Sequence, residues 1–175
     1  MDVGLLVLRI GVGGLMFGHG AQKLWGWFGG HGLRGTSGFL ESLGFRPGSR
    51  WAPLHGAAEA TGGALLALGF LTPLGAGAVV GVMLVASVVV HGDKGLWATG
   101  GGYELPLLFA VGATALAFAG PGRYSLDAAL GLPLAGWPFG LGAVALGLLA
   151  GVAVIAARRP LEQRAEDEAR IRRAA

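Results

Sequence analysis

The chain has 175 residues, of which 53% are hydrophobic and only 13% are charged. Soluble domains are about one quarter charged, so this composition excludes a soluble globule and predicts an integral membrane protein. The 35 glycines follow no three-residue period, which excludes collagen, and the absence of cysteine excludes dithiol chemistry, cysteine-based zinc sites and cysteine-held iron–sulfur clusters. The formal net charge is only +3, with no basic patch interleaved with aromatic residues, so we expect no nucleic-acid partner.

Five apolar segments predict an all-α integral membrane fold with five transmembrane helices. The first segment lacks the basic stretch of a cleaved signal peptide, so we expect it to be retained. In chain order the segments are Val3–Phe28, Ala52–Leu71, Leu74–Val90, Glu104–Ala119 and Pro133–Ala157.

The connections between these segments differ in length. Thr72-Pro73 leaves only a short turn, so the second and third helices are predicted to be antiparallel neighbours. The connection over residues 29–50 is long, and Phe39, Leu40 and Leu43 share one side of a short helical pattern within it, which predicts an interfacial helix.

Basic residues gather in alternate connections, which predicts the orientation of the chain. With five spans, Lys23, Lys94 and the cluster that begins at Arg158 all lie on one side, and the positive-inside rule makes that side cytoplasmic. The tail over residues 158–175 holds six basic and four acidic residues, with acidic–basic pairs at i,i+4 spacing that predict a solvated helix.

Glycine pairs four residues apart predict close approaches between helices in lipid. Such steps occur at Gly14 and Gly18, at Gly77 and Gly81, and at Gly147 and Gly151.

Ionisable residues inside spans are costly and mark functional sites. His55 and Glu59 share a helix face at i,i+4 spacing, and Glu104 opens the fourth segment, where the helix dipole favours a carboxylate. Arg9 is explained equally by snorkelling to the headgroups and by an ion pair with Glu59.

His19 and Lys23 also share a face, near Gln22, and His91 ends the third segment. The histidines and carboxylates together offer ligand types for a metal or a haem, but none of their spacings matches a known ligand signature, so no metal site is predicted. Lys23 could equally snorkel, and a lone histidine at a helix end is commonly just hydrogen-bonded.

Four stretches, in this order, resemble the DoxX-like family of bacterial inner-membrane proteins. They are Leu8-Arg9-Ile10 through Phe17-Gly18-His19-Gly20-Ala21-Gln22-Lys23-Leu24; Glu59-Ala60-Thr61-Gly62-Gly63 with Leu68-Gly69-Phe70-Leu71-Thr72; His91 with Gly101-Gly102-Tyr103-Glu104; and Gly120-Pro121-Gly122-Arg123-Tyr124-Ser125-Leu126-Asp127.

The resemblance implies a DoxX-like four-helix membrane domain over residues 1–130, with a four-helix transmembrane bundle as the core of the fold. The fifth apolar segment and the tail depart from this shorter form, so residues 131–157 are expected to form an additional transmembrane helix and residues 158–175 a charged cytoplasmic tail. It also implies a bacterial inner-membrane oxidoreductase or a subunit of one, since some relatives are linked to thiosulfate:quinone oxidoreduction and others to quinone-type or oxidative stress.

These two lines of reasoning predict one intramembrane polar pocket that binds a quinone or a similar amphipathic ligand. Glu59 is expected to exchange the proton that accompanies quinone reduction, and His19 or Lys23 to hydrogen-bond a quinone oxygen. Glu59 and His19 are therefore the expected catalytic residues. The expected ligand-binding residues are Arg9, Gln22, Lys23, His55, His91 and Glu104.

The expected partners are the lipid bilayer and a redox subunit or bound cofactor that supplies electrons, while the oligomeric state stays open between monomer and homo-oligomer. One alternative is a non-catalytic scaffold in which an ion-pair network, such as Arg9–Glu59, holds the helices in register. Another is a small transporter or proton pathway, although the inverted repeats of transporters are not evident.

Overall fold

The computed structural model describes residues 1–159, and every regular element in that range is helical. This confirms the all-α class; the predicted tail helix lies outside the described residues. The helices are α1 (Asp2–Trp25), α2 (Gly32–Ser42), α3 (Gly48–Leu68), α4 (Thr72–Val85), α5 (Glu104–Ala119), α6 (Leu126–Ala129) and α7 (Trp137–Ala156). One π-helical turn, η2 (Ala86–Val90), extends α4, and three short 3₁₀ turns lie at Trp27–Gly29, Gly92–Lys94 and Ala98–Gly100.

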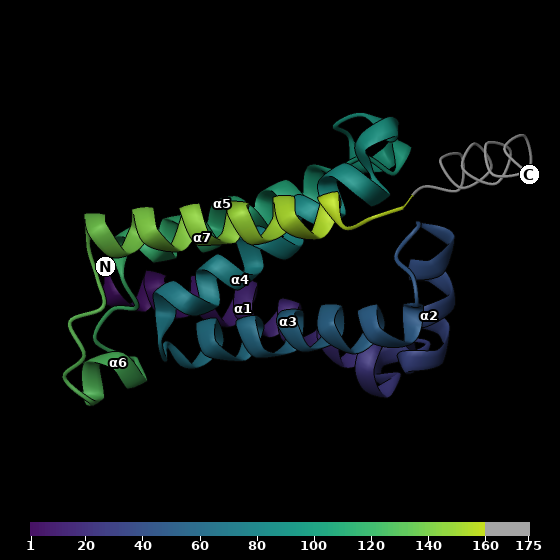
Figure 1. Cartoon of the computed structure of the whole chain (residues 1–175). Helices are drawn as coiled ribbons and strands as arrows, with labels where there is room; N and C mark the ends of the chain where they lie inside the picture. The colour runs from purple at the N-terminus through teal and green to yellow at the C-terminus, as the bar shows by residue number, and fades with distance from the viewer. Residues whose placement is uncertain (160–175) are drawn as a thin grey trace, which may run out of the picture.

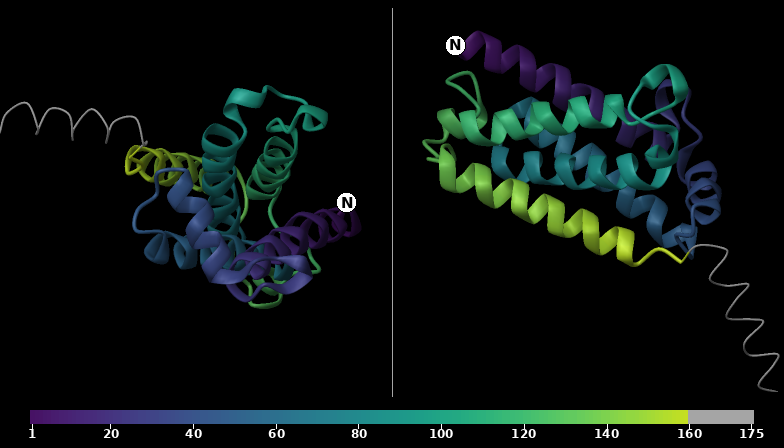
Figure 2. Two further views of the ribbon diagram at one scale, coloured as in Figure 1. Left: turned by 90° about the vertical axis from the view of Figure 1, so that its right-hand side faces the viewer. Right: turned by 90° about the horizontal axis from the view of Figure 1, so that it is seen from above.

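Five long helices run back and forth along one common direction, as Figures 1 and 2 show. We call the two ends of this bundle the α2 end and the α6 end. The α2 end holds α2, the connection from η2 to α5 and the last turn of α7, and the α6 end holds the N-terminus, the turn from α3 to α4 and α6 (Figure 1). The predicted basic connections therefore share the α2 end. Which side of the membrane this end faces stays a prediction.

The five long helices correspond to the five predicted spans. Three stretches of the described chain are long and apolar enough to cross a membrane by length and composition: α1, α4 with η2, and α7. Helix α5 is apolar but has only 16 residues, or roughly 24 Å at 1.5 Å per residue, which is less than a bilayer core. Helix α3 has 21 residues but carries Arg50, His55 and Glu59. The chain is thus a multi-pass membrane protein.

The turn from α3 to α4 is as short as the sequence predicts. Gly69 follows the last residue of α3 and has a φ of 61°, a left-handed conformation that glycine adopts readily because it has no Cβ. Leu71 also has a positive φ, of 45°. The carboxylate of Asp127, from α6, accepts hydrogen bonds from the backbone N–H of Leu71 at 2.8 Å and of Thr72 at 3.0 Å. These bonds satisfy free N–H groups at the start of α4 and hold the two helices as antiparallel neighbours.

Helices α1 and α3 approach through glycines, but not through the predicted pair. Gly14 and Gly18 have open space where a Cβ would lie, so their prediction as a contact is wrong. The contact uses Gly13, Gly20 and Gly63 instead: a Cβ added to Gly20 would lie 2.7 Å from both Cα and Cβ of Ala60. Helix α1 is apolar on several sides, so the spacing of its glycines does not reveal which side faces its neighbour.

The glycine contact between α4 and α7 is confirmed. A Cβ on Gly77 would lie 2.8 Å from the carbonyl oxygen of Ala143, and a Cβ on Gly81 would lie 2.8 Å from that of Gly147. Gly151 meets the carbonyl of Gly81 in the same way. In lipid, where apolar surface gives helices little reason to associate, such close backbone packing is a main source of attraction.

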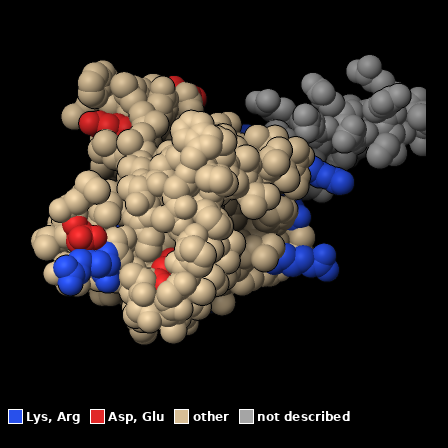
Figure 3. Space-filling view, turned by 90° about the vertical axis from the view of Figure 1, so that its left-hand side faces the viewer, with Lys and Arg blue, Asp and Glu red and all other residues tan. Residues whose placement is uncertain are grey.

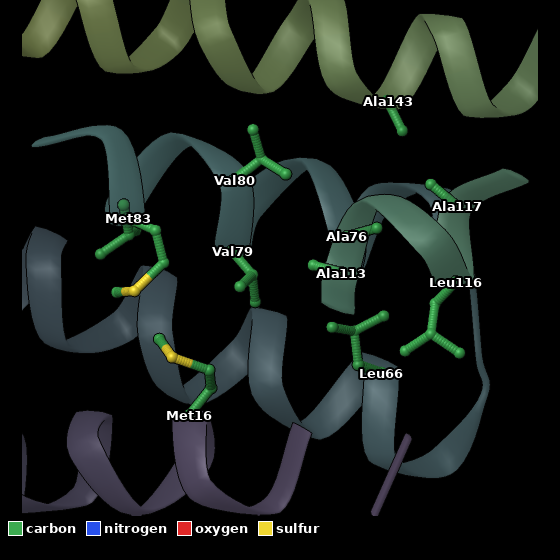
Figure 4. Packing of buried hydrophobic residues seen from close by; sticks show 11 residues of the cluster. Met16, Leu66, Ala76, Val79, Val80, Met83, Ala113, Leu116, Ala117 and Ala143 are labelled. Atoms are coloured by element: carbon green, nitrogen blue, oxygen red, sulfur yellow. The ribbon is translucent and has the colours of Figure 1, made fainter. Parts of the chain in front are cut away.

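The interior is filled by a cluster centred on α4. Figure 4 shows Val79 and Met83 among side chains from α1 and α3, while Val80 points toward α7. Large apolar side chains also cover the outside, including Val7, Leu108 and Leu149, each more than half exposed. Charged side chains are sparse on the face in Figure 3. Apolar side chains both inside and outside suit a bundle surrounded by lipid.

Candidate functional site

A partly enclosed cavity of about 340 Å³ lies at the α2 end of the bundle. Its walls come from α1, α2, α3, the end of α4 with η2, and α5. Most of the lining is apolar, and the volume falls within the roughly 300–1,000 Å³ of small-molecule sites. The apolar side chains larger than alanine are Phe39, Leu40, Leu43, Phe45, Val82, Met83, Val85, Val89, Val90, Leu105, Pro106 and Phe109.

Five of the predicted polar residues line this cavity: His19, Lys23, His55, Glu59 and His91. The i,i+4 spacing predicted from the sequence places His19 and Lys23 on one face of α1, and His55 and Glu59 on one face of α3. Because the two helices pack closely, these faces meet at the cavity. The cavity therefore has a polar side formed by α1 and α3 and an apolar side formed by α2, α4 and α5.

The Nζ of Lys23 donates a hydrogen bond to Oε2 of Glu59, and the two groups form an ion pair. The side chain of Glu59 is 4% exposed and that of Lys23 is 28% exposed, so the pair reaches from the packed interior toward the open part of the cavity. An ion pair removed this far from water depends on both partners, because either charge alone would be costly there.

His55 is half-buried against aromatic rings, with ring centroids 5.6 Å from Phe45 and 6.4 Å from Trp51. Its Nε2 atom is shielded from solvent and has no hydrogen-bond partner. A buried polar atom without a partner costs about 1–3 kcal/mol, and such atoms call for an explanation.

His91 follows the π-helical turn η2, and turns of this kind are frequent at functional sites. Its Nδ1 lies 2.6 Å from the carbonyl oxygen of Gly101, which can only accept, so Nδ1 carries the hydrogen. In the neutral ring, Nε2 is then an acceptor. The same bond attaches the end of η2 to the loop before α5, which forms part of the cavity wall.

Three of the predicted ligand-binding residues do not line the cavity. Gln22 donates from Nε2 to the carbonyl of Phe28 at 3.1 Å and so shapes the chain after α1. Glu104 accepts from the backbone N–H of Ala98 at 2.9 Å and orders the loop beside the cavity. Arg9 lies near the α6 end. The single predicted pocket therefore forms from five of its eight residues.

The predicted ion pair between Arg9 and Glu59 is wrong. Arg9 is 1% exposed, and its guanidinium donates to the backbone carbonyls of Ala67, at 3.2 Å, and of Tyr124. It does not snorkel to the surface either. The reason is the antiparallel packing of α1 and α3, which sets Arg9 beside the last turn of α3 and Lys23 beside Glu59.

Asp127 was not among the predicted site residues, yet its side chain is completely buried. Besides the two backbone N–H groups at the start of α4, it accepts from Oγ1 of Thr72 at 2.7 Å. The sequence signal was its place at the end of the stretch Gly120–Asp127 that resembles the DoxX-like family. Its role in the structure is to hold α6 against the turn between α3 and α4.

Within residues 1–159, no group of three or more His, Asp or Glu side chains is arranged to hold a metal ion. The fold and the cavity together define a helical membrane protein with an amphipathic cavity near one end of its bundle. The chain belongs to the DoxX family, whose family model matches residues 4–92. No curated protein and no solved structure matches it.

The match covers α1 to α4 with η2 and ends one residue after His91. All five polar residues of the cavity therefore lie in the matched part. Of the other two stretches that resembled the family, the one that contains Asp127 lies beyond the match, and the one that contains Glu104 lies beyond it except for His91. The domain predicted over residues 1–130 is longer than this match and stays a prediction.

Proposed function

We propose that the cavity binds the ring of a quinone and that the chain serves a membrane redox system as its quinone-binding component. The observation that carries this proposal is the division of the cavity into an apolar side and a polar side, with the Lys23–Glu59 ion pair, His19 and His55 on the polar side. A quinone has the same division, since its flat ring is apolar and its two oxygens accept hydrogen bonds.

In this proposal Lys23 and His19 donate hydrogen bonds to a ring oxygen, and Glu59 supplies protons. Reduction of a quinone to a quinol consumes two electrons and two protons. The electrons come from a partner protein with a flavin, haem or iron–sulfur centre. The Glu59 carboxylate takes up a proton through the open part of the cavity and passes it to the reduced ring, once for each of the two protons. The chain would then act in the bacterial inner membrane, with the α2 end facing the cytoplasm.

The test is the quinone content of protein purified with its native lipids. Glu59→Gln keeps the shape of the side chain but removes the proton exchange and the charge, and His19→Ala removes a donor. The matched control is Gln22→Ala, a change in the same part of α1 at a residue that does not line the cavity. We expect the first two variants to lose most of the bound quinone and the control to keep it.

The ion pair also ties α1 to α3, which favours the scaffold as the second candidate function. The scaffold predicts that Glu59→Gln lowers the unfolding temperature while the quinone content stays at the wild-type level. Equal quinone in the wild type, both cavity variants and the control would refute quinone binding at this site.

A further inference from the structure

An apolar groove runs along the outside of the bundle between α4 and α7 and reaches α3 toward the α2 end. It consists of two adjoining hollows of about 440 Å³ and 340 Å³, which share Gly77, Ala78 and Ala150. The first extends to Pro73 and Pro138 near the α6 end, and the second extends to Trp51 and His55 near the α2 end. The glycines that bring α4 and α7 together thus also leave room beside them.

The groove and the polar cavity share part of one wall. His55, Val82 and Val85 line both the second hollow and the cavity. His55 is therefore placed between a lipid-facing groove and the interior, and its ring carries the buried Nε2 atom that has no partner. Of the three side chains that separate the groove from the cavity, His55 is the polar one.

We propose that the groove holds the apolar tail of the ligand whose ring enters the cavity, and that His55 is the gate between them. This inference rests on the proposed function and names its ligand class: a quinone with a long hydrocarbon tail, taken up sideways from the bilayer. Helix α7, which lies outside the part of the chain matched by the family model, supplies one wall of the route.

The groove acts by shape rather than by hydrophobic attraction. Lipid tails are as apolar as the groove, so moving a hydrocarbon tail from one to the other yields little free energy. A side chain that fills the groove will therefore exclude a tailed ligand through steric overlap. A ligand without a tail can reach the cavity through its open part and will be unaffected.

Ala150 and Ala145 provide a matched pair of positions on α7. Both are exposed, but Ala150 lines both hollows and Ala145 lines neither. The experiment compares Ala150→Phe with Ala145→Phe in lipid nanodiscs, with two probes: a benzoquinone that has no side chain and the same ring with a decyl chain. Quenching of tryptophan fluorescence reports binding, since Trp51 lies in the groove beside His55.

We expect Ala150→Phe to weaken binding of the decyl quinone about tenfold, or roughly 1.4 kcal/mol, and to leave the tailless quinone unchanged. Ala145→Phe should change neither. Ala150→Leu, with a smaller side chain, should give a loss in the same direction and replaces Ala150→Phe if that variant does not fold.

Unchanged decyl quinone binding in both Ala150 variants would refute the groove while leaving the cavity as the binding site. Failure of both probes to bind the wild-type protein would instead refute the proposed function. An equal loss of both probes in the Ala150 variants would also refute the groove, because it would show damage to the cavity rather than exclusion of a tail.

Discussion

The close contact between α1 and α3 predicts different effects for alanine substitutions at two nearby glycines of α1. Gly20 lies in the contact, where an added Cβ would fall within 2.7 Å of Cα and Cβ of Ala60, whereas Gly18 has open space in the same place. We therefore expect Gly20→Ala to force the helices apart and Gly18→Ala to be accommodated. The two variants have identical chemistry and lie half a turn apart.

The magnitude follows from two opposing effects. Replacing glycine by alanine inside a helix stabilises it by about 1 kcal/mol, and this gain applies at both positions. Overpacking costs about 1–3 kcal/mol, and it should reach the upper part of this range at Gly20 because the neighbouring atoms belong to the backbone and Cβ of Ala60, which cannot rotate away. Gly20→Ala should thus be less stable than Gly18→Ala by about 2–3 kcal/mol.

The assay is reversible unfolding of both variants in mixed detergent micelles, with helical circular dichroism as the signal. The cavity gives a second measurement, because separation of α1 from α3 would also pull Lys23 away from Glu59. Gly20→Ala should therefore bind less quinone than Gly18→Ala. Equal stability of the two variants would refute the close packing of α1 on α3 through Gly20.

Two further predictions concern buried charges. Asp127→Asn leaves a single carbonyl oxygen to accept hydrogen bonds from the N–H groups of Leu71 and Thr72. We therefore expect thermal unfolding to show a free energy of unfolding lower by about 1–2 kcal/mol. Unchanged stability would mean that Asp127 does not hold this turn. Lys23→Met leaves the carboxyl group of Glu59 buried without its partner, so we expect it to lower the free energy of unfolding by about 3–5 kcal/mol. In a double-mutant cycle, the double variant of Lys23→Met with Glu59→Gln should regain most of this loss. A double variant no more stable than Lys23→Met would refute the pairing.

The helices were predictable from the sequence because length and hydropathy determine where a chain can cross lipid. The predicted segment Glu104–Ala119 coincides with α5, and the helix predicted inside the long first connection is α2. Thr72-Pro73 marked the turn between α3 and α4 correctly, since proline suits the first turn of a helix. All of these predictions depend on local properties of the chain.

The rotation of each helix about its axis was not predictable in the same way. Helix α1 has apolar residues on both its inner and outer sides, such as Met16, which is buried, and Leu15, which is 61% exposed. In lipid both sides are stable, so hydrophobicity does not distinguish them. The choice between Gly14 with Gly18 and Gly13 with Gly20 needs the partner helix, which the sequence alone does not identify.

The pairing of charges also depends on the partner helix, because the antiparallel packing of α1 on α3 determines which basic residue of α1 lies beside Glu59. Gly13 contacts Ala67, Gly20 contacts Ala60 and Lys23 contacts Glu59. Residues later in α1 therefore contact residues earlier in α3. Arg9 is 14 residues from Lys23, or roughly 21 Å along the helix, and cannot reach the same carboxylate. The two basic residues of α1 thus have separate tasks: Arg9 binds the end of α3 and the chain before α6, while Lys23 and Glu59 form the polar side of the cavity. A substitution of Arg9 should therefore act on stability alone, whereas a substitution of Lys23 should also change the cavity directly.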